Sequence, residues 1–254
     1  MTVAYKNISI AGGDTAKPLA MAKRLKVISR HLKPDAGLFL DCGCGSGEYV
    51  IALMEQFGLD AHGIEYNRQK VSLAQSHGVL KNRVTQGDLQ SIDSPAGAWD
   101  YAMLNEVLEH IPDEGRALKE IHRILKPGGI LFIFSPNRWF PFETHGVNWK
   151  KSGRRVPHWL PFVPYLPLRL GQSFFSYWAR NYWQGELARL AARGGFSVIE
   201  RNYVWQTFEN ISGAQPRLIG MVRPLLRAVS NRLEKTPFLR RFGVSQALVC
   251  RKEI

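Results

Sequence analysis

A glycine-rich turn directly after an apolar strand constrains the fold of this chain more than any other feature. Residues 38–47 read LFLDCGCGSG, so Asp41 lies at the end of the strand and Gly43, Gly45 and Gly47 occupy every second position after it. Glycine has no Cβ, so backbone N–H groups in such a turn can approach a ligand closely and adopt angles that other residues avoid. The turn therefore predicts a site for a small polar ligand.

Polar residues also follow or end the next three apolar runs. They are Glu65 in the run 60–65, Asp88 with Leu89 after the run 82–87, and Asn105 after the run 98–104. Because parallel strands place their carboxyl ends at one edge of a sheet, we expect these residues to lie beside the glycine turn. A carboxylate at the position of Glu65 can accept hydrogen bonds from both hydroxyls of a ribose.

Helical stretches alternate with these strands, which is the pattern of a doubly wound parallel sheet. Further elements are expected as helices at 15–32, 48–57, 112 to about 126 and 184–193, and as strands at 130–134, 197–205 and 245–252. The sequence predicts an α/β, Rossmann-like fold with seven mostly parallel strands, an N-terminal helix and two insertions that form a lid.

The order of the motifs resembles that of the class I S-adenosylmethionine (SAM) methyltransferases, and most of all the broad group that includes the ubiquinone and menaquinone methyltransferases. The motifs are D-x-G-x-G-x-G at 41–47, G-D-L at 87–89, N-E-V-L-E-H at 105–110 and L-K-P-G-G-I-L-F-I at 125–133. The resemblance covers about residues 36–137 and, more loosely, 185–205. It implies an enzyme that transfers the methyl group of its cofactor, S-adenosyl-L-methionine.

A dinucleotide-binding dehydrogenase is the alternative explanation of the glycine turn. Its fingerprint is G-x-G-x-x-G, whereas residues 43–47 read G-x-G-x-G, and the G-D-L motif at 87–89 has no role in that fingerprint. The sequence therefore favours SAM.

The resemblance also implies roles for the residues at the sheet edge. Gly43, Gly45 and Gly47 would line the methionine part of SAM, Glu65 would bind the ribose, Asp88 and the Leu89 backbone would meet the adenine, and Asn105 would lie beneath the sulfonium. For Asp41, contact with the cofactor and a structural hydrogen bond to the turn remain alternatives.

The residues after Asn105 suggest the chemistry. If Asn105 starts a helical turn, Glu106, Glu109 and His110 share one face of it. His110 could then take a proton from an acceptor hydroxyl, because imidazole titrates near neutral pH. The E-x-x-E-H spacing resembles the Mg²⁺ motif of certain quinone and small-RNA O-methyltransferases. It is also widespread in the broader group without a metal, so the sequence assigns no metal ligands.

A second candidate base, His145, follows the fifth strand. It lies near the carboxyl edge of the sheet, where open α/β folds usually bind their substrates. Two interpretations remain open for Glu143 and His145: they take part in the chemistry, or they only hold the surrounding segment through hydrogen bonds.

Charge is distributed unevenly along the chain. Residues 1–139 carry 16 Lys+Arg and 15 Asp+Glu, so the net charge of +13 lies almost wholly in the second half, with six of the seven tryptophans after residue 138. The expected parts are a SAM-binding core with the N-terminal helix at 1–137, an aromatic and basic acceptor lid at 138–183, and the end of the core sheet at 184–254 with a basic insertion at about 208–243. The prolines at 157, 161, 164 and 167 rule out a continuous helix in this part of the lid but allow an extended apolar flap.

The basic second half allows three interpretations: a site for a lipid or lipid-linked acceptor at an anionic membrane surface, an RNA surface, or a solvated basic face over an apolar flap. Leucines, phenylalanines and tryptophans spaced by prolines beside arginines favour an amphiphilic acceptor, so nucleic acid is the weaker choice. We expect O-methylation of a lipid, a lipid-linked sugar or a quinone-like molecule. The alternatives are an RNA 2′-O-methyltransferase with Mg²⁺ dependence and a SAM-binding scaffold without turnover.

Targeting signals and cysteines bear on location. The N-terminus shows no secretion signal, no apolar run has the length of a membrane span, and the three cysteines form no disulfide pattern. We expect a cytoplasmic protein that can lie against the inner membrane face, and the sequence leaves its oligomeric state open.

Overall fold

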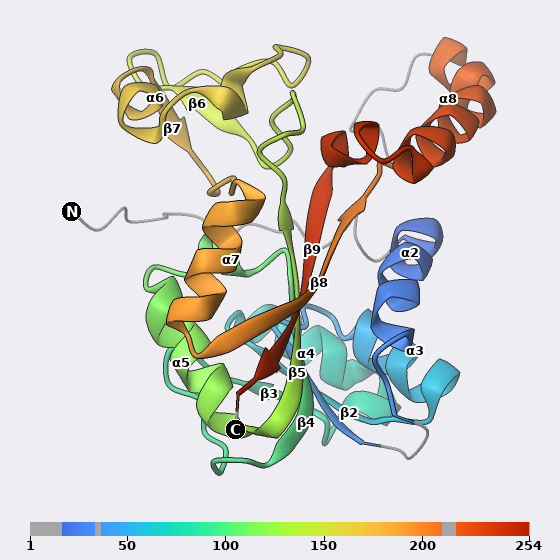
Figure 1. Cartoon of the computed structure of the whole chain (residues 1–254), viewed down its shortest axis with the longest axis vertical. Helices are drawn as coiled ribbons and strands as arrows, with labels where there is room; N and C mark the ends of the chain where they lie inside the picture. Colours follow the sequence, from blue (N-terminus) through green and yellow to red (C-terminus); the bar gives the residue numbers. More distant parts are fainter. Residues whose placement is uncertain (1–16, 34–36, 210–216, 254) are drawn as a thin grey trace.

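One seven-stranded sheet forms the centre of the molecule (Figure 1). The computed structural model describes residues 17–33, 37–209 and 217–253. The strands follow the order β3-β2-β1-β4-β5-β9-β8, with bounds β1 Leu38–Cys42, β2 Asp60–Glu65, β3 Val84–Gln86, β4 Trp99–Asn105, β5 Leu125–Pro136, β8 Phe196–Val204 and β9 Ser245–Lys252. Strands β1 to β5 are parallel, and β9 is antiparallel to both of its neighbours. The predicted fold class is confirmed.

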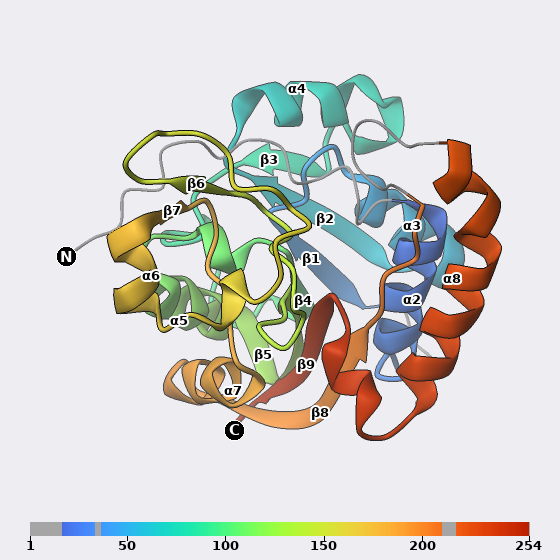
Figure 2. The same ribbon diagram turned by 90° about the horizontal axis from the view of Figure 1, so that it is seen from above.

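Helices cover both faces of this sheet (Figure 2). They are α2 Pro18–Ser29, α3 Glu48–Phe57 and α4 Arg68–Ser76 on one face, and α5 Glu114–Ile124 and α7 Gln184–Arg193 on the other. Successive strand residues alternate between the two cores, so that Phe39 packs with α2 and α3 while Leu40 packs with α5 and α7. Such alternation buries both faces and stabilises the sheet as a central layer.

Local sequence signals account for several helix boundaries. The Asn67 side chain accepts hydrogen bonds from the first backbone N–H groups of α4, and Asp113 does the same for Arg116 in α5. The helices predicted at 48–57 and 184–193 are confirmed with the same bounds. The first helix is confirmed over Pro18–Ser29, while residues 15 and 16 of that prediction lie outside the described part.

The start of β5 differs from the prediction. The turn at residues 126–129 was expected to end a helix and precede the strand, but β5 already begins at Leu125, which pairs with Trp99. The pairing then shifts register, because Tyr101 pairs with Ile130. The four residues between the two pairs form an irregularity inside the strand, and Gly128 supplies the positive φ of +74° that it requires.

Residues 138–183 fold into a small layer of their own, which we call the lid. It contains β6 Val147–Trp149, the 3-10 turn η3 Val163–Tyr165, α6 Leu168–Phe174 and β7 Phe175–Tyr177, with β6 and β7 paired antiparallel. Its apolar side chains Val147, Val156, Val163 and Phe175 pack together. The lid therefore contains no long continuous helix in its described residues, and instead of an extended flap it forms short elements around a small core of its own.

The second insertion, between β8 and β9, contains α8 Arg217–Lys235 and the turn η4 Leu239–Phe242. Ser245, at the start of β9, pairs with Pro136 at the end of β5 and with Val204 at the end of β8. The lid and the α8 insertion therefore leave the sheet at the same edge, which is where Figure 1 shows them. Within the described ranges, the structure contains no helix with the length and hydropathy needed to cross a bilayer.

Candidate active site

The three glycines of the turn have different surroundings. A Cβ at Gly43 would lie 2.5 Å from the Val107 side chain, and one at Gly47 would lie 2.4 Å from Leu80, so packing against the protein itself requires glycine at these positions. Gly45, also at positive φ, has no atom within 4 Å of the position of its missing Cβ. Open space beside a bare backbone at the carboxyl edge fits the binding of a small ligand.

Glu65 connects the second strand to this turn. Its carboxylate is buried and accepts hydrogen bonds from the backbone N–H groups of Gly45 at 2.9 Å and Asn67 at 2.8 Å. Each carboxylate oxygen has two lone pairs, so the group can hold the turn and still accept from a ribose hydroxyl. The predicted ribose role remains a prediction, and the structure adds a positioning role that the sequence did not show.

Asp41 is buried beneath the turn, and its Oδ1 has no hydrogen-bond partner among the described residues. The pKa of Asp41 is raised to about 8, mainly by burial and in smaller part by the nearby carboxylates of Glu65 and Glu48. A buried carboxyl group with an unused oxygen fits a cationic ligand group, such as the amino group of a SAM methionine moiety.

The remaining predicted cofactor residues lie along the same edge. Asp88 accepts a hydrogen bond from the backbone N–H of Gln90 at 2.8 Å, and Leu89 is buried in the core. Asn105 ends β4, and its buried Oδ1 has no partner in the described part of the chain. The assigned contacts of these three residues with adenine and sulfonium stay predictions.

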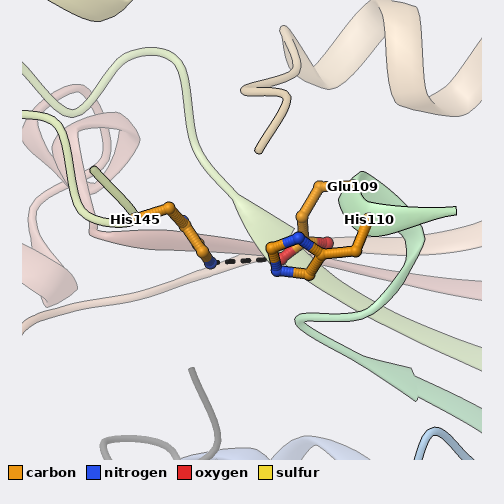
Figure 3. Close-up of side chains that lie close together, drawn as sticks. All are labelled: Glu109, His110 and His145. Carbon is orange, nitrogen blue, oxygen red and sulfur yellow. Dashed lines mark ion pairs between the residues drawn. The ribbon is translucent and has the colours of Figure 1, made fainter. Parts of the chain in front are cut away.

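Three side chains converge beside the end of β4 (Figure 3). Glu109 and His110 lie in the 3-10 turn Leu108–His110, and His145 comes from the lid. The His145 Nε2 lies 3.4 Å from the Glu109 Oε1, and the two imidazole rings are 5.3 Å apart, edge to face. One possible ligand atom from each residue lies within 4.8 Å of the others. The structure thus brings together both predicted catalytic histidines.

The burial of this cluster affects its protonation. Burial raises the pKa of Glu109, and the neighbouring carboxyl of Glu106 raises it further. Burial, followed by the nearby His145, lowers the pKa of His110 to about 4. His110 is therefore a neutral imidazole at neutral pH, with a nitrogen lone pair available for a cation, and its low pKa argues against the predicted role as a general base.

The predicted helical turn from Asn105 is wrong. Asn105 still belongs to β4, and the Glu106 N–H donates to the Phe134 carbonyl of β5 at 2.9 Å. Glu106 then adopts a positive φ of +55°, and its carboxylate contacts Arg24 at 3.0 Å and the Ser245 hydroxyl at 2.5 Å. The hydrogen bond to β5 thus keeps Asn105 and Glu106 out of the helical turn that their spacing favours. The cluster accordingly contains Glu109, His110 and His145, and Glu106 is not part of it.

Sequence reasoning missed Arg24 and Ser245. The periodicity of the first helix places its bases on a polar face, yet Arg24 is buried and also donates to Ser245 at 3.0 Å. Their partner Glu106 lies far away in the sequence, so no local pattern could have revealed these contacts.

Glu143 organises the lid segment that carries His145. One oxygen of its buried carboxylate accepts from the backbone N–H groups of Thr144 and His145, both at 3.1 Å, and the other accepts from Asn181 at 2.9 Å. These hydrogen bonds support the structural role considered for Glu143, which is to hold the backbone of this lid segment. The His145 side chain, in contrast, extends into the cluster.

The strand order, the antiparallel β9 and the glycine turn define a Rossmann-like fold of the methyltransferase type. The chain belongs to the methyltransferase family, because the family model described as "Methyltransferase domain" matches residues 17–201. It thus carries a SAM-dependent methyltransferase domain, for which SAM is the methyl donor. The open space at Gly45 and the unused oxygen of Asp41 fit that cofactor.

Individual relatives are distant. A ubiquinone biosynthesis O-methyltransferase from Xanthomonas axonopodis pv. citri is 31% identical over 119 residues, which are 45% of this chain and 49% of that protein. The chain thus spans about half the length of the curated relatives it matches. A SAM-dependent methyltransferase structure from Mesorhizobium loti has a TM-score of 0.59 at 17% identity and covers 91% of this chain and 98% of its own. The [4+2]-cyclase SpnF has a TM-score of 0.58 at 21% identity, covering 92% and 82%. These two structures show the shared fold alone.

Proposed function

We propose that this methyltransferase methylates a hydroxyl group of an amphiphilic acceptor, of the lipid, lipid-linked sugar or quinone-like type. The observation that carries the proposal is the convergence of Glu109, His110 and His145 beside Asn105, the residue predicted to lie beneath the sulfonium. A group that receives a proton beside the donor methyl suits an acceptor oxygen, because a hydroxyl must lose its proton during attack.

The reaction would be an in-line displacement. Bound SAM would supply a methyl group on a cationic sulfur, and its transfer to the acceptor oxygen would break the carbon–sulfur bond and leave the electron pair on a neutral thioether. His145 is the base we favour for the hydroxyl proton, because the lowered pKa of His110, about 4, makes that imidazole a poor proton acceptor at neutral pH. Because the leaving group starts as a cation, positioning and the exclusion of water supply much of the acceleration, and the base contributes about 10²- to 10⁴-fold.

The same cluster fits a divalent cation. Both Glu109 carboxylate oxygens are buried without a hydrogen-bond partner among the described residues, and two imidazoles lie beside them. Glu109, His110 and His145 would hold the ion, and two imidazoles with one carboxylate suit a transition metal such as Mn²⁺ or Fe²⁺ better than Mg²⁺, which prefers oxygen ligands. A bound cation would lower the pKa of an acceptor hydroxyl.

Two observations support an amphiphilic acceptor. The curated relatives named above are ubiquinone biosynthesis O-methyltransferases, and this chain matches about half of their length. The lid beside the cluster carries many aromatic residues, including Trp139, Trp178 and Trp183, with Arg138 over the Trp183 ring at 5.1 Å and Arg155 over the Trp178 ring at 5.1 Å. Aromatic surface with cations beside it suits a flat or apolar molecule that carries an anionic group.

The test incubates the full chain with SAM labelled in the methyl group and with fractionated cell extract. We expect label in the organic-soluble fraction, in a product whose methyl group resists mild base as an ether does. Label in nucleic acid would replace the proposal by the RNA alternative. SAM binding without label in any fraction would replace it by the scaffold alternative.

A second assay addresses the cation. The labelled reaction is repeated after treatment with EDTA and after addition of Mn²⁺, Fe²⁺ or Mg²⁺. Loss with EDTA and recovery with Mn²⁺ or Fe²⁺ would support the assignment of the three ligands, and indifference to EDTA would remove the cation from the proposal.

A further inference from the structure

Helix α8 turns polar side chains toward the rest of the protein. The Arg227 guanidinium donates to a backbone carbonyl of the segment after β8 at 2.7 Å, and the buried Ser230 hydroxyl donates to another at 2.8 Å. Glu234 forms an ion pair with Lys23 of α2 at 2.7 Å. These contacts fix which side of α8 faces inward.

The opposite side of α8 is apolar and exposed. Three apolar residues, Val222, Leu225 and Val229, are spaced by three and four positions and therefore share one side of the helix. The exposed fraction is 66% for Leu225 and 47% for Val229. Phe238, just beyond the helix, is 62% exposed. We call the three helical residues Val222, Leu225 and Val229 the outer face of α8. A surface helix normally packs its apolar side against the core. In α8 the apolar side faces outward, which indicates that it binds a partner outside this chain.

The segment that carries the outer face is rich in basic residues. Residues 217–242 contain seven Lys or Arg and one acidic residue, Glu234, which is already paired with Lys23. Among the bases, Arg232, Lys235 and Arg241 are exposed. An apolar stripe bordered by cations is the pattern of a helix that lies in the interface of an anionic membrane, where the stripe enters the acyl boundary and the bases meet phosphate groups.

The lid presents a second surface of the same kind. Trp159 is 74% exposed and Phe162 is 60% exposed, and the exposed bases Arg154 and Arg155 lie nearby in the sequence. Residues 138–183 contain a single acidic residue, Glu143, which is buried. Both insertions rise from the carboxyl edge of the sheet, and Figures 1 and 2 show the lid and α8 flanking that end of the molecule.

We propose that the outer face of α8, together with the exposed aromatic residues of the lid, binds the surface of an anionic lipid bilayer. The bilayer would then lie across the end of the molecule where the catalytic cluster is found. A membrane fits both observations better than RNA, because exposed aliphatic side chains such as Leu225 and Val229 offer nothing for bases to stack on. The proposal is separate from the methyl acceptor, because binding to vesicles requires no turnover.

The test is co-sedimentation of the full chain with vesicles of phosphatidylcholine alone or mixed with phosphatidylglycerol. We expect binding to the mixed vesicles, weaker binding at high salt, and little binding to phosphatidylcholine alone. The double variant Leu225→Asp/Val229→Asp should reduce the bound fraction by about tenfold or more, because two charges would enter the acyl boundary. Leu73→Asp, at an exposed leucine of α4, is the matched control and should bind like the wild type.

Equal thermal stability and SAM affinity of all three proteins would show that the substitutions leave the fold intact. Four outcomes would overturn the proposal. The first is no binding of the wild type to mixed vesicles, and the second is equal binding of the double variant. The third is a dimer in sedimentation velocity that the double variant dissociates, which would assign the outer face to a second copy of this chain. Tight binding of the wild type to an RNA homopolymer without binding to vesicles would likewise replace the membrane by nucleic acid.

Discussion

The guanidinium of Arg24 lies 3.0 Å from the carboxylate of Glu106 and connects helix α2 to the end of β4. Both side chains are almost fully buried, and Ser245 from β9 donates to the same carboxylate. Glu106 directly follows Asn105 and carries the positive φ that ends the strand. The ion pair therefore holds the backbone at the point where the predicted cofactor site and the cluster of Glu109, His110 and His145 meet.

Removing one partner of this pair should strongly destabilise the protein. Arg24→Met leaves the Glu106 carboxylate buried without its cation, and we expect a loss of about 3–5 kcal/mol in the free energy of unfolding. The double variant Arg24→Met/Glu106→Gln removes both charges and should recover at least half of that loss. Urea unfolding of the three proteins measures both values. A single variant as stable as the wild type would show that the pair contributes no net stability.

The glycine turn allows a test that separates packing from ligand binding. At Gly47 an alanine would contact Leu80 at 2.4 Å as well as adopt positive φ, so Gly47→Ala should cost about 2–4 kcal/mol of stability. At Gly45 the added methyl group meets no protein atom, so Gly45→Ala should cost only about 1 kcal/mol, for its positive φ. Calorimetric titration with SAM should nevertheless show weaker binding to Gly45→Ala. Unchanged SAM affinity in this variant would mean that the cofactor does not occupy the open space.

Sequence patterns predicted the sheet and the edge at which the site lies, because local signals determine both. The alternation of apolar runs with helical stretches depends on neighbouring residues, and so does the glycine turn that begins at Gly43. The cluster depends instead on contacts between distant segments: His145 reaches Glu109 only because the lid folds around its own core and Glu143 holds its backbone. Glu106 shows the converse, since pairing with β5 replaced the helical turn that its spacing favoured.

Asp41 should make the stability of the ligand-free protein depend on pH. Its pKa is raised to about 8 in the folded state, above the ordinary value of 3.8 that the unfolded chain would show. The folded state thus keeps a proton that the unfolded state releases, so this contribution is fully present below about pH 4 and is lost as the pH rises toward 8, by up to about 1.4 kcal/mol per pH unit. Asp41→Asn cannot titrate and should remove this slope.

Thermal unfolding of the wild type and Asp41→Asn across that pH window measures the difference. The stability advantage of the variant should grow as the pH rises. SAM should act in the opposite direction on the wild type, because a cationic ligand group favours the ionised carboxylate, so SAM affinity should increase from about pH 6 to 8 with release of a proton. Parallel pH profiles for the two proteins would contradict the burial of an unpaired carboxyl group at this position.

His145 should contribute to methyl transfer without affecting cofactor binding. Its ring contacts Glu109 and lies edge to face with His110, so His145→Ala should lower kcat by about 10²- to 10⁴-fold while the Kd for SAM stays the same. His158 is the matched control in the same lid, because its Nδ1 lies 3.3 Å from the Glu143 backbone carbonyl and it does not belong to the cluster of Glu109, His110 and His145. His158→Ala should therefore keep kcat within about threefold of the wild type, as expected for a substitution outside the reacting groups. Equal losses of kcat in both variants would assign His145 to the integrity of the lid, whereas a loss confined to His145→Ala would place its imidazole in the proton transfer.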